Sequence, residues 1–474
     1  MTPLGKTDPR PDAGWVGACG WALIAIVCFH CAQTFGIGWL VIPCAFGLIE
    51  LSRWSSGRKV FYLSLATGFL FYAPELGFFW HIFRSAAIVL WLIASIWVAA
   101  FGLLLYLIRR RFGNGVMLAS APFIWTGLEY FRSELYYLRF AWLTLGLSFG
   151  NSPQIASGIG VYGLGFLGVA IAAGLNWIRT NSWYRVAILA GTVVVLNGVT
   201  YLIPLPPIES TQAINVAGIQ LEFPSKGGVL TALNQVIKKF PETQLIMLSE
   251  YTFEEPVPDT IRNWCREHHR YLVAGGEEPL GGDNYYNMAY VVGPDGTIVH
   301  RQAKSVPIQF FKDGKPAPGQ EVWQSPWGPI GILICYDLSY SRVVDNFVRH
   351  GARALLAPTM DVGEWGLHQH QLHSHVAPLR AAEYGIPIFR VCSSGISQLV
   401  TSRGTVVATA PFPGVSSIIT GKLEPARNPK LPWDRFLAPV CVGFAAGMAI
   451  LLLALSARRS AGPGTRSDDD PFTG

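Results

Sequence analysis

Three residues of types that cooperate in acyl-transfer chemistry follow apolar or hairpin-like runs in the second half of the chain. Glu250 comes directly after residues 245–249, Cys335 comes after residues 330–334, and Lys304 follows a hairpin-like segment. A thiol becomes a strong nucleophile when a base takes its proton, and a carboxylate can be that base. A fixed ammonium group stabilises both a thiolate and the oxyanion of a tetrahedral intermediate. The three residues are therefore a candidate catalytic set, although a cysteine at a strand end is also a common packing residue.

The elements that must position these residues are short β-rich runs alternating with helical patterns between residues 211 and 424. Such alternation predicts a layered α/β domain with buried strands. A buried strand holds the residue at its end rigidly at a surface, so strand ends are common places for catalytic residues. The predicted strands are 213–220, 245–248, 271–274, 289–292, 330–335, 354–357 and 388–391, and the predicted helices are 228–240, 258–269, 341–350 and 368–385.

The composition of the whole chain is that of a membrane protein. Of the 474 residues, 51% are hydrophobic, 13% are aromatic and only 14% are charged. Soluble globular proteins carry about 25% charged residues. This composition excludes a disordered chain, a disulfide-stapled small protein and an ordinary cytosolic enzyme. The net charge of +6 is small for this length and lies near the ends of apolar segments, so it does not indicate nucleic-acid binding.

Eight apolar stretches are each close to the roughly 20 residues that cross a bilayer as a helix. The sequence therefore predicts a multi-pass α-helical membrane region of about eight transmembrane helices. The predicted spans are 14–34, 36–52, 60–82, 86–108, 115–131, 155–177, 184–204 and 436–456. The expected organisation is an N-terminal cytoplasmic tail (1–13), a seven-helix domain (14–204), an extracytoplasmic catalytic domain (211–424), a C-terminal transmembrane helix (436–456) and a disordered cytoplasmic tail (457–474).

Basic residues near the segment ends indicate the orientation in the membrane. All four basic clusters fall on one side if both termini are cytoplasmic, which leaves the 211–424 domain outside the cytoplasm. The first stretch has a neutral leading region and no small-x-small cleavage site, so we expect a retained helix rather than a signal peptide. The clusters are Arg53, Arg58 and Lys59; Arg109, Arg110 and Arg111; Arg179 and Arg185; and Arg458 and Arg459.

The run Gly331-Ile-Leu-Ile-Cys335-Tyr336-Asp337, with Glu250 upstream and Lys304 between, resembles the nitrilase superfamily of carbon–nitrogen hydrolases. The resemblance implies a Glu–Lys–Cys triad on a four-layer α-β-β-α sandwich. Further motifs are similar to those of apolipoprotein N-acyltransferases, so that the resemblance covers about 14–456. These motifs are Gly68-Phe-Leu-Phe, Gly77-Phe-Phe-Trp80, Trp125, Glu129-Tyr-Phe-Arg132, Phe140-Ala-Trp142, Gly146, Gln154, Gly160-Val-Tyr-Gly163, His373, Ala377, Arg380-Ala-Ala-Glu383 and Ser394-Gly395-Ile396.

The resemblance implies a ping-pong acyl transfer in the bacterial inner membrane, with the catalytic domain on the periplasmic face. A phospholipid would give an acyl chain to Cys335, and the resulting thioester would be attacked by the amine of a diacylglyceryl-cysteine lipoprotein. Glu250 would be the general base, and Lys304 would stabilise the oxyanion together with backbone N–H groups near Tyr336. The resemblance implies no metal or other cofactor and no nucleic acid, and we expect a monomer.

Three positions depart from the family pattern. The family usually has a glutamate two residues after the nucleophile, whereas this chain has Asp337. The loop after the lysine commonly contains a glutamate, whereas this chain has Gln309, which can form hydrogen bonds but cannot serve as a base. Glu364, in the segment that usually reads Ser-Asn-Asp-x-Trp-Phe, is one candidate for the missing carboxylate.

Two other groups of side chains suggest chemistry less strongly. His368, His370, His373 and His375 form a dense cluster, but their spacing offers no close pair at i, i+4, so a metal site is the less favoured interpretation. Outside the predicted spans, Cys265 and Cys392 accompany Cys335. An exported domain can hold disulfides, but the sequence leaves the state of Cys265 and Cys392 open.

Two alternatives to the acyltransferase stay open from the sequence. The first is a membrane-tethered amidase of the same superfamily that uses water as the acceptor, which Asp337 and the missing loop glutamate favour. The second is a non-catalytic membrane scaffold. The presence of Glu250, Lys304 and Cys335 together argues against a scaffold, which needs none of them.

Overall fold

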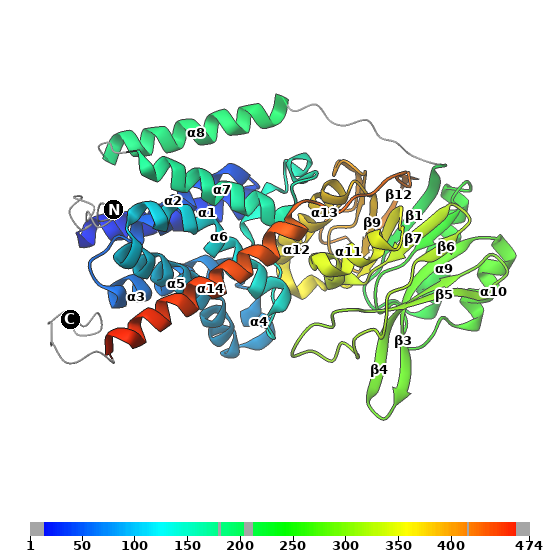
Figure 1. Cartoon of the computed structure of the whole chain (residues 1–474). Coiled ribbons are helices and arrows are strands. Elements are labelled where there is room, and N and C mark those ends of the chain that lie inside the picture. Colours follow the sequence, from blue (N-terminus) through cyan, green and yellow to red (C-terminus); the bar gives the residue numbers. More distant parts are fainter. Residues whose placement is uncertain (1–13, 179–181, 203–211, 415–416, 461–474) are drawn as a thin grey trace. The chain divides into compact units, whose positions relative to one another are not determined.

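The structure is a computed structural model that describes residues 14–178, 182–202, 212–414 and 417–460 (Figure 1). The chain divides into two compact units. The helical unit is made of Met1–Ser152, Ile159–Ile203 and Trp433–Gly474, and the α/β unit is made of Pro153–Gly158 and Pro204–Pro432. The predicted tail at 1–13, the proline-rich segment at 204–207 and residues 461–474 of the predicted C-terminal tail lie outside the described residues.

The described part of the helical unit is built from long apolar helices and shorter connecting turns. Its α-helices are α1 (Trp15–Phe35), α2 (Val41–Leu51), α3 (Gly57–Glu75), α4 (Phe79–Phe83), α5 (Ala86–Phe112), α6 (Asn114–Tyr130), α7 (Val161–Trp177), α8 (Ser182–Leu202) and α14 (Asp434–Ser460). Helix α3 packs along α5, and α6 packs along both α7 and α14. A Cβ atom on Gly127 of α6 would lie 2.4 Å from the carbonyl oxygen of Cys441 in α14, so a small residue is needed for this close approach.

Four of the described helices are long and apolar enough to cross a membrane, which is fewer than the eight predicted. They are Trp15–Phe35, Ala86–Phe112, Trp183–Thr200 and Asp434–Arg458. The other predicted spans are shorter or interrupted. A 3-10 turn at Gly38–Leu40 leaves α2 with 11 residues, and the 155–177 segment becomes helical only at Val161. The 60–82 segment is divided between α3 and α4, and α6 has 17 residues.

The start of α14 is joined to the start of α7 by a side-chain cap. The Asp434 carboxylate accepts hydrogen bonds from the backbone N–H groups of Tyr162 (2.8 Å) and Gly163 (3.3 Å). These are N–H groups of the first turn of α7, which have no partner within the helix. The Arg435 guanidinium also pairs with Asp434 at 2.7 Å. Segments more than 270 residues apart in sequence are therefore fixed to each other.

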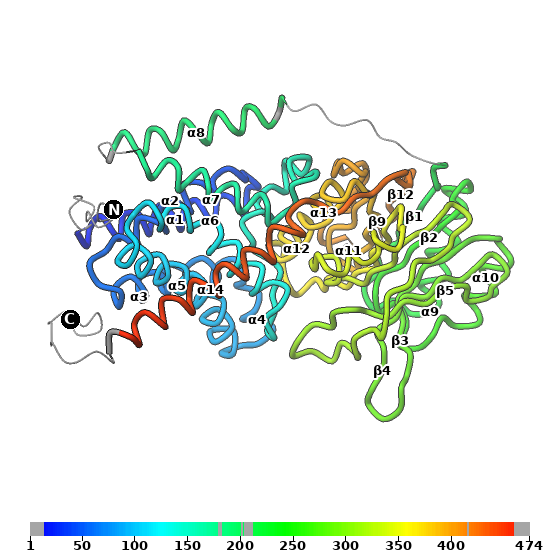
Figure 2. Tube along the Cα trace, in the orientation of Figure 1, coloured from blue at the N-terminus to red at the C-terminus, as the bar shows by residue number. Residues whose placement is uncertain are grey.

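Two six-stranded sheets form the centre of the α/β unit (Figures 1 and 2). Their strand orders are β12-β1-β2-β3-β4-β5 and β11-β10-β9-β8-β7-β6. In each sheet three adjacent strands are parallel, β1 to β3 and β7 to β9, and the outer pairs are antiparallel. The strands are β1 (Ile214–Gln220), β2 (Leu245–Met247), β3 (Tyr271–Gly281), β4 (Asn284–Val292), β5 (Ile298–Ala303), β6 (Trp323–Ser325), β7 (Gly328–Ile332), β8 (Ala354–Thr359), β9 (Ile388–Cys392), β10 (Gln398–Val400), β11 (Val406–Thr409) and β12 (Ser417–Leu423).

The buried side chains show four layers. One core cluster joins the two sheets and includes Val216 and Met247 from the first sheet and Ile332 and Phe389 from the second. A second cluster joins the first sheet to α9 (Lys226–Lys239) and α10 (Asp259–His268). On the second sheet lie α11 (Ser341–Arg349) and α13 (Val376–Tyr384). Successive side chains of a strand point to opposite faces, so each sheet can contribute to two layers. The unit is a nitrilase-like α-β-β-α sandwich, as the resemblance implied.

The seven predicted strands and the first three predicted helices of this unit are confirmed, with changes at their ends. The strand predicted at 330–335 ends at Ile332. The helix predicted at 368–385 is wrong as a single helix, because it consists of α12 (Gly366–Ser374) and α13, which meet at His375. Pro378, in the first turn of α13, has no N–H to donate to the preceding turn, which accounts for the break. The short strands β6, β10 and β11 and the edge strands β5 and β12 were not predicted.

Candidate active site

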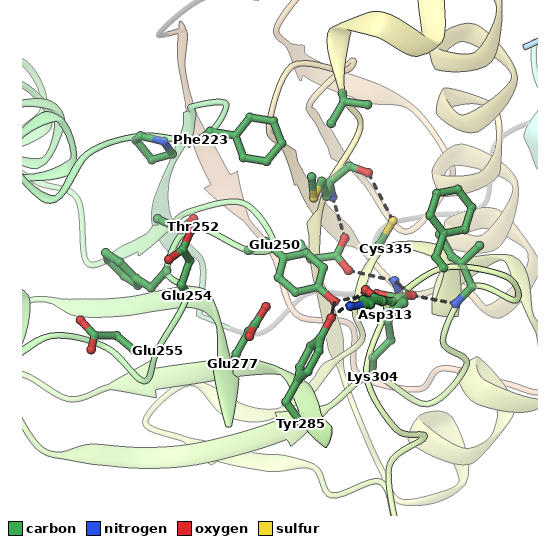
Figure 3. Close-up of a pocket in the computed structure, with 18 of the residues that line it drawn as sticks. Phe223, Glu250, Thr252, Glu254, Glu255, Glu277, Tyr285, Lys304, Asp313 and Cys335 are labelled. Atoms are coloured by element: carbon green, nitrogen blue, oxygen red, sulfur yellow. Dashed lines mark hydrogen bonds and ion pairs between the residues drawn. The ribbon is translucent and has the colours of Figure 1, made fainter. Parts of the chain in front are cut away.

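The three residues singled out in the sequence line one pocket of the α/β unit (Figure 3). Glu250 follows β2, Lys304 follows β5, and Cys335 follows β7 as the first residue of a 3-10 turn, Cys335–Ser339. Strands β2 and β5 belong to the first sheet and β7 to the second, so the site is assembled from both sheets. The pocket has a volume of about 950 Å³.

Lys304 is a buried cation held by two carboxylates. Its Nζ lies 2.8 Å from Oε1 of Glu250 and 2.8 Å from Oδ2 of Asp313. The Lys304 and Glu250 side chains are each only 1% exposed. In Figure 3 the side chains of Glu250, Lys304, Asp313 and Cys335 point toward one another. A buried charge is stable only when it is paired and hydrogen-bonded, and this arrangement meets that condition.

Asp313 is a site residue that the sequence reasoning missed. Its carboxylate accepts hydrogen bonds from the Tyr251 hydroxyl at 2.9 Å and from the backbone N–H of Ile308 at 2.7 Å, in addition to its contact with Lys304. The signal was present, because Asp313 is the first acidic residue after Lys304. Asp313, rather than Glu364, is therefore the second carboxylate that contacts the lysine. Glu364 is exposed in the short turn Gly363–Trp365.

Asn287 is a second residue that the sequence reasoning missed. Its Nδ2 donates to Oε1 of Glu250 at 2.6 Å and to Oδ1 of Asp313 at 2.9 Å. Asn287 lies on β4 and is fully buried. An amide that donates to two carboxylates keeps both of them oriented toward the lysine between them. No sequence signal distinguished it from other polar residues of the strand.

The nucleophile candidate lies at a sharp turn in the backbone. Cys335 has a φ of 52°, in the left-handed region that costs a non-glycine residue about 1–2 kcal/mol. Its thiol donates to the carbonyl oxygen of Met360 at 3.7 Å. The backbone N–H of Met360 in turn donates to Oε2 of Glu250 at 2.7 Å. The Met360 residue therefore contacts both the thiol and the carboxylate.

The electrostatics favour a protonated thiol next to a base and a permanent cation. Burial, together with the Glu250 charge, raises the pKa of Cys335 well above its usual value, and Lys304 acts in the opposite direction. Burial also raises the pKa of Glu250, and Lys304 partly offsets this effect. For Lys304, burial alone would lower the pKa, but Asp313 and Glu250 outweigh it and raise the pKa well above the usual value. A carboxylate with a raised pKa is a better general base.

Asp337 connects the nucleophile turn to the loop after the lysine. Its carboxylate accepts from the backbone N–H groups of Val306 (2.7 Å), Ser305 (3.0 Å) and Ile334 (3.1 Å). Burial raises the pKa of Asp337 to about 6, and these hydrogen bonds act against the increase. Asp337 fixes the position of Cys335 relative to Lys304, because it binds the segments next to each of them.

The other two predicted secondary residues lie near the site. Tyr336 is half-buried next to Cys335, and its ring packs edge-on against Tyr340 with centroids 5.0 Å apart. Gln309 is half-buried in the loop after Lys304, between Ile308, which lines the pocket, and Phe310. Neither side chain is among those that line the described pocket.

The pocket wall has an aromatic part and an acidic part. Phe223, Phe253, Phe311 and Trp365 supply aromatic surface. Three further carboxylates, those of Glu254, Glu255 and Glu277, gather on the side of the pocket away from Cys335 (Figure 3). The pocket therefore offers contacts for an apolar chain as well as for a positively charged group.

Among the described residues, no group of three or more potential metal ligands is arranged around a common point. His373 instead contacts the buried carboxylate of Asp361 at 2.8 Å through Nδ1. Cys265 and Cys392, whose state the sequence left open, are both free thiols and are both buried.

Comparison with known proteins gives two domain matches in the same order as the two halves of the sequence. Residues 22–174 match the family model for the apolipoprotein N-acyltransferase N-terminal domain, and residues 236–426 match the model for carbon-nitrogen hydrolases. An apolipoprotein N-acyltransferase of Geobacter metallireducens is 26% identical over 415 residues, which cover 75% of this chain and 79% of that protein.

Relatives of the second domain are also found outside that family. An omega-amidase of Xenopus laevis is 25% identical over 229 residues, covering 44% of this chain and 81% of that protein. A solved structure of Nit3 from Saccharomyces cerevisiae, a member of branch 10 of the nitrilase superfamily, aligns with a TM-score of 0.40 at 23% identity. That alignment covers 46% of this chain and 92% of the yeast protein. The chain therefore pairs an apolipoprotein N-acyltransferase N-terminal domain with a carbon-nitrogen hydrolase domain, and it is similar to apolipoprotein N-acyltransferases over most of its length.

Proposed function

We propose that the protein transfers an acyl chain from a phospholipid, through a thioester on Cys335, to the N-terminal amine of a diacylglyceryl-cysteine lipoprotein. The observation that carries the proposal is the buried Lys304, paired with Glu250 and Asp313 in the same pocket as the Cys335 thiol. A site that keeps a carboxylate base, a cation and a thiol together is suited to acyl transfer by a covalent route. Similarity to apolipoprotein N-acyltransferases supports the choice of substrates.

In the first half-reaction Glu250 takes the thiol proton, and the sulfur attacks the ester carbonyl carbon of the phospholipid. Lys304, with backbone N–H groups near Tyr336, stabilises the negative charge that develops on the carbonyl oxygen. When the C–O bond breaks, Glu250 returns its proton to the leaving oxygen, and a lysophospholipid departs. The acyl chain is now held on Cys335 as a thioester.

In the second half-reaction the neutral amine of the lipoprotein attacks the thioester carbonyl, and Glu250 takes a proton from the nitrogen. The C–S bond breaks, the amide product leaves, and the thiolate recovers a proton from Glu250. Two carboxylates on the pocket wall, Glu254 and Glu277, suit the approach of a positively charged N-terminus, whereas Glu255 pairs with Lys226. The aromatic wall and the volume of about 950 Å³, near the upper end of ordinary ligand pockets, suit a long acyl chain.

The membrane arrangement that accompanies this function is also a proposal. The first 13 residues and residues 457–474 are cytoplasmic tails, 14–204 is a seven-helix membrane domain, 211–424 is the catalytic domain, and 436–456 is an eighth crossing. The four described helices that are long and apolar enough to span a bilayer support this arrangement in part. The proposed catalytic domain lies on the extracytoplasmic face of a bacterial inner membrane, which the basic clusters support, and the proposed protein is a monomer.

Mass spectrometry of the purified protein after exposure to phospholipid vesicles tests the proposal. We expect an acyl adduct on the peptide that contains Cys335, cleaved by hydroxylamine and removed when a diacylglyceryl lipopeptide is added. Cys335→Ala should show no adduct, whereas Cys265→Ala, which removes a buried thiol outside the pocket, should retain it. The absence of any adduct from the folded native protein would overturn the phospholipid-donor reaction.

The same experiment distinguishes the alternative of a membrane-tethered amidase. An amidase of this superfamily would use water as the second acceptor, so an adduct would decay in buffer without forming an acylated lipopeptide. The omega-amidase relatives match only the second domain of the chain, whereas the Geobacter acyltransferase matches 75% of it. We therefore favour the acyltransferase.

A further inference from the structure

A single backbone residue contacts both the base and the nucleophile. The N–H of Met360 donates to Oε2 of Glu250 at 2.7 Å, and its carbonyl oxygen accepts from the thiol of Cys335 at 3.7 Å. Met360 follows the end of β8 and lines the pocket, as does Val362 two residues later. The position of this short segment therefore determines how Glu250 and Cys335 face each other.

Between these two pocket residues, Asp361 does not line the pocket and its side chain is fully buried. Its Oδ2 lies 2.5 Å from Nη2 of Arg390, and its Oδ1 lies 2.8 Å from Nδ1 of His373. Gln369 also donates to Oδ1 at 3.2 Å. Three donors from β9 and α12 therefore meet on one carboxylate directly behind the catalytic pocket.

The backbone of Asp361 is held from a third direction. Its N–H donates to the hydroxyl oxygen of Ser393 at 3.0 Å, and its carbonyl oxygen accepts from that hydroxyl and from the backbone N–H of Ser394. Arg390 is itself held by donating to the carbonyl oxygen of Ile396 at 2.7 Å. The backbone of Asp361 is thus anchored to the loop that follows β9, while its side chain is held by residues of β9 and α12.

The Asp361 carboxylate and the Arg390 guanidinium of this network carry opposite charges, which balance each other. Burial alone would raise the pKa of Asp361, but His373 and Arg390 outweigh it and hold the pKa well below its usual value. Burial, followed by the Arg390 charge, lowers the pKa of His373, whose Nδ1 lies 2.8 Å from the Asp361 carboxylate. A buried ion pair that loses one partner leaves an uncompensated charge, which strongly favours local rearrangement.

We propose that Asp361, His373 and Arg390 are positioning residues for catalysis, which fix the Met360 peptide so that it orients Glu250 against Cys335. The inference rests on the proposed function, because it assigns these residues a part in the acylation of Cys335. None of the three touches the reacting atoms, so each acts through Met360. Placement of reacting groups is sensitive at this scale, since a shift of about 1 Å can reduce a rate about 100-fold.

The first consequence concerns the pH at which acylation becomes fast. An N–H group that donates to a carboxylate favours its ionised form, so loss of the Met360 contact raises the pKa of Glu250. The groups that face Glu250 from the neighbouring elements are Lys304, Asp313, Asn287 and the Cys335 thiol. A substitution at Asp361 leaves Lys304, Asp313 and Asn287 unchanged, and it removes a charge that raises the pKa of the Cys335 thiol. Because that thiol gives its proton to Glu250, the ionisation of Glu250 still sets the pH at which acylation becomes fast. The rise of the acylation rate with pH should therefore move to higher pH in the Asp361→Asn protein.

The second consequence concerns His373, where a substitution that keeps the N–H donor should preserve the acylation rate. Asparagine can place an N–H group where Nδ1 of histidine lies, whereas leucine fills a similar volume without a donor. His373→Asn should therefore retain most of the acylation rate, and His373→Leu should lose it about as far as Asp361→Asn does. A role limited to filling the core would instead favour leucine over asparagine, since burial of the amide costs more.

The test measures the rate of acyl-enzyme formation on Cys335 between pH 5 and 9, by intact-protein mass spectrometry of the full-length protein with phospholipid vesicles. The matched control is Asp345→Asn, because Asp345 is another buried aspartate of the same unit that accepts from the Tyr384 hydroxyl at 2.6 Å and does not line the pocket. We expect Cys335 of the Asp361→Asn protein to be acylated about 100-fold more slowly than in the native protein. The increase of this rate with pH should also occur at a higher pH. Asp345→Asn should acylate as the native protein does.

Each outcome has a separate meaning. If the native protein forms no adduct on Cys335, the proposed function fails, and with it the basis of the inference. If the native protein is acylated and folded Asp361→Asn has the native rate and pH profile, the inference fails while the proposed function stands. If His373→Leu is faster than His373→Asn, the hydrogen bond is not what matters and the inference also fails. Thermal unfolding of each variant shows whether a slow rate reflects an unfolded protein.

Discussion

Replacing Asp313 by asparagine removes one of the two carboxylates around Lys304 while keeping the shape of the side chain. Oδ2 of Asp313 and Oε1 of Glu250 both lie 2.8 Å from the same Nζ, so the two oxygens are no more than about 6 Å apart. At an effective dielectric constant of about 20, two unit charges about 5 Å apart interact by about 3 kcal/mol. That energy corresponds to about two pKa units.

The sign of the change follows from the charges. The Asp313 charge disfavours ionisation of Glu250 and raises its pKa, so its removal lowers that pKa by up to about two units. Glu250 must be ionised to act as the base, and the acylation rate therefore rises with pH through its pKa. In Asp313→Asn this rise should occur at lower pH than in the native protein. The plateau rate should be about tenfold lower, because Glu250 becomes a weaker base.

The assay is the initial rate of acyl-enzyme formation on Cys335 as a function of pH, with thermal unfolding as a check on folding. Asp283→Asn, in the exposed turn between β3 and β4, makes the same chemical change away from the site and should leave the profile unchanged. The reasoning would be refuted if the acylation rate of folded Asp313→Asn increased at the same pH as that of the native protein, or at a higher pH. That result would mean that Glu250 is insulated from the Asp313 charge.

Further predictions follow from the packing around the site. A Cβ on Gly275 would lie 2.6 Å from the Cα of Glu250, so Gly275→Ala should lower stability by about 1–3 kcal/mol and slow acylation. Gly227→Ala, at a helical position with nothing within 4 Å, should instead be neutral or stabilising in the same thermal unfolding assay. Asp337→Asn should be destabilised by about 2–4 kcal/mol, because its amide group would face backbone N–H donors; an unchanged unfolding temperature would contradict this. Glu364→Gln should acylate at the native rate and with the native pH profile, and a shifted profile would show that the exposed carboxylate takes part.

Much of the α/β unit could be predicted because its strands are continuous apolar runs. The buried strands at 214–220 and 245–247 are separated by α9, and those at 328–332 and 354–359 are separated by α11; this alternation indicates sheets with parallel centres. The short strands at 398–400 and 406–409 escaped prediction because they are only three and four residues long. Their pairing with β9 and with each other, rather than their own pattern, makes them strands.

In the helical unit, hydropathy located the apolar segments better than it located their ends. Residues 86–108 and 436–456 lie within the long helices α5 and α14. The segment at 36–52, in contrast, holds an 11-residue helix after a tight turn, and every residue of that helix is buried. Average apolarity does not distinguish a helix buried by its neighbours from one that faces lipid, and only four described helices are long and apolar enough to match the eight predicted spans.

The sequence by itself determined the chemical set of the site, because Glu250, Lys304 and Cys335 each follow a recognisable apolar or hairpin-like run, and these positions matched a family pattern. The tertiary structure alone decided what surrounds them. Asn287, Asp313 and Met360 reach Glu250 or Lys304 from other segments of the fold, up to 110 residues away in the sequence. Such contacts depend on the packing of two sheets and their loops and leave no period or spacing in the sequence. Asp313, and not the candidate Glu364, contacts Lys304, because the fold of the loop after Lys304, and not residue type, determines which acidic side chain reaches the buried cation.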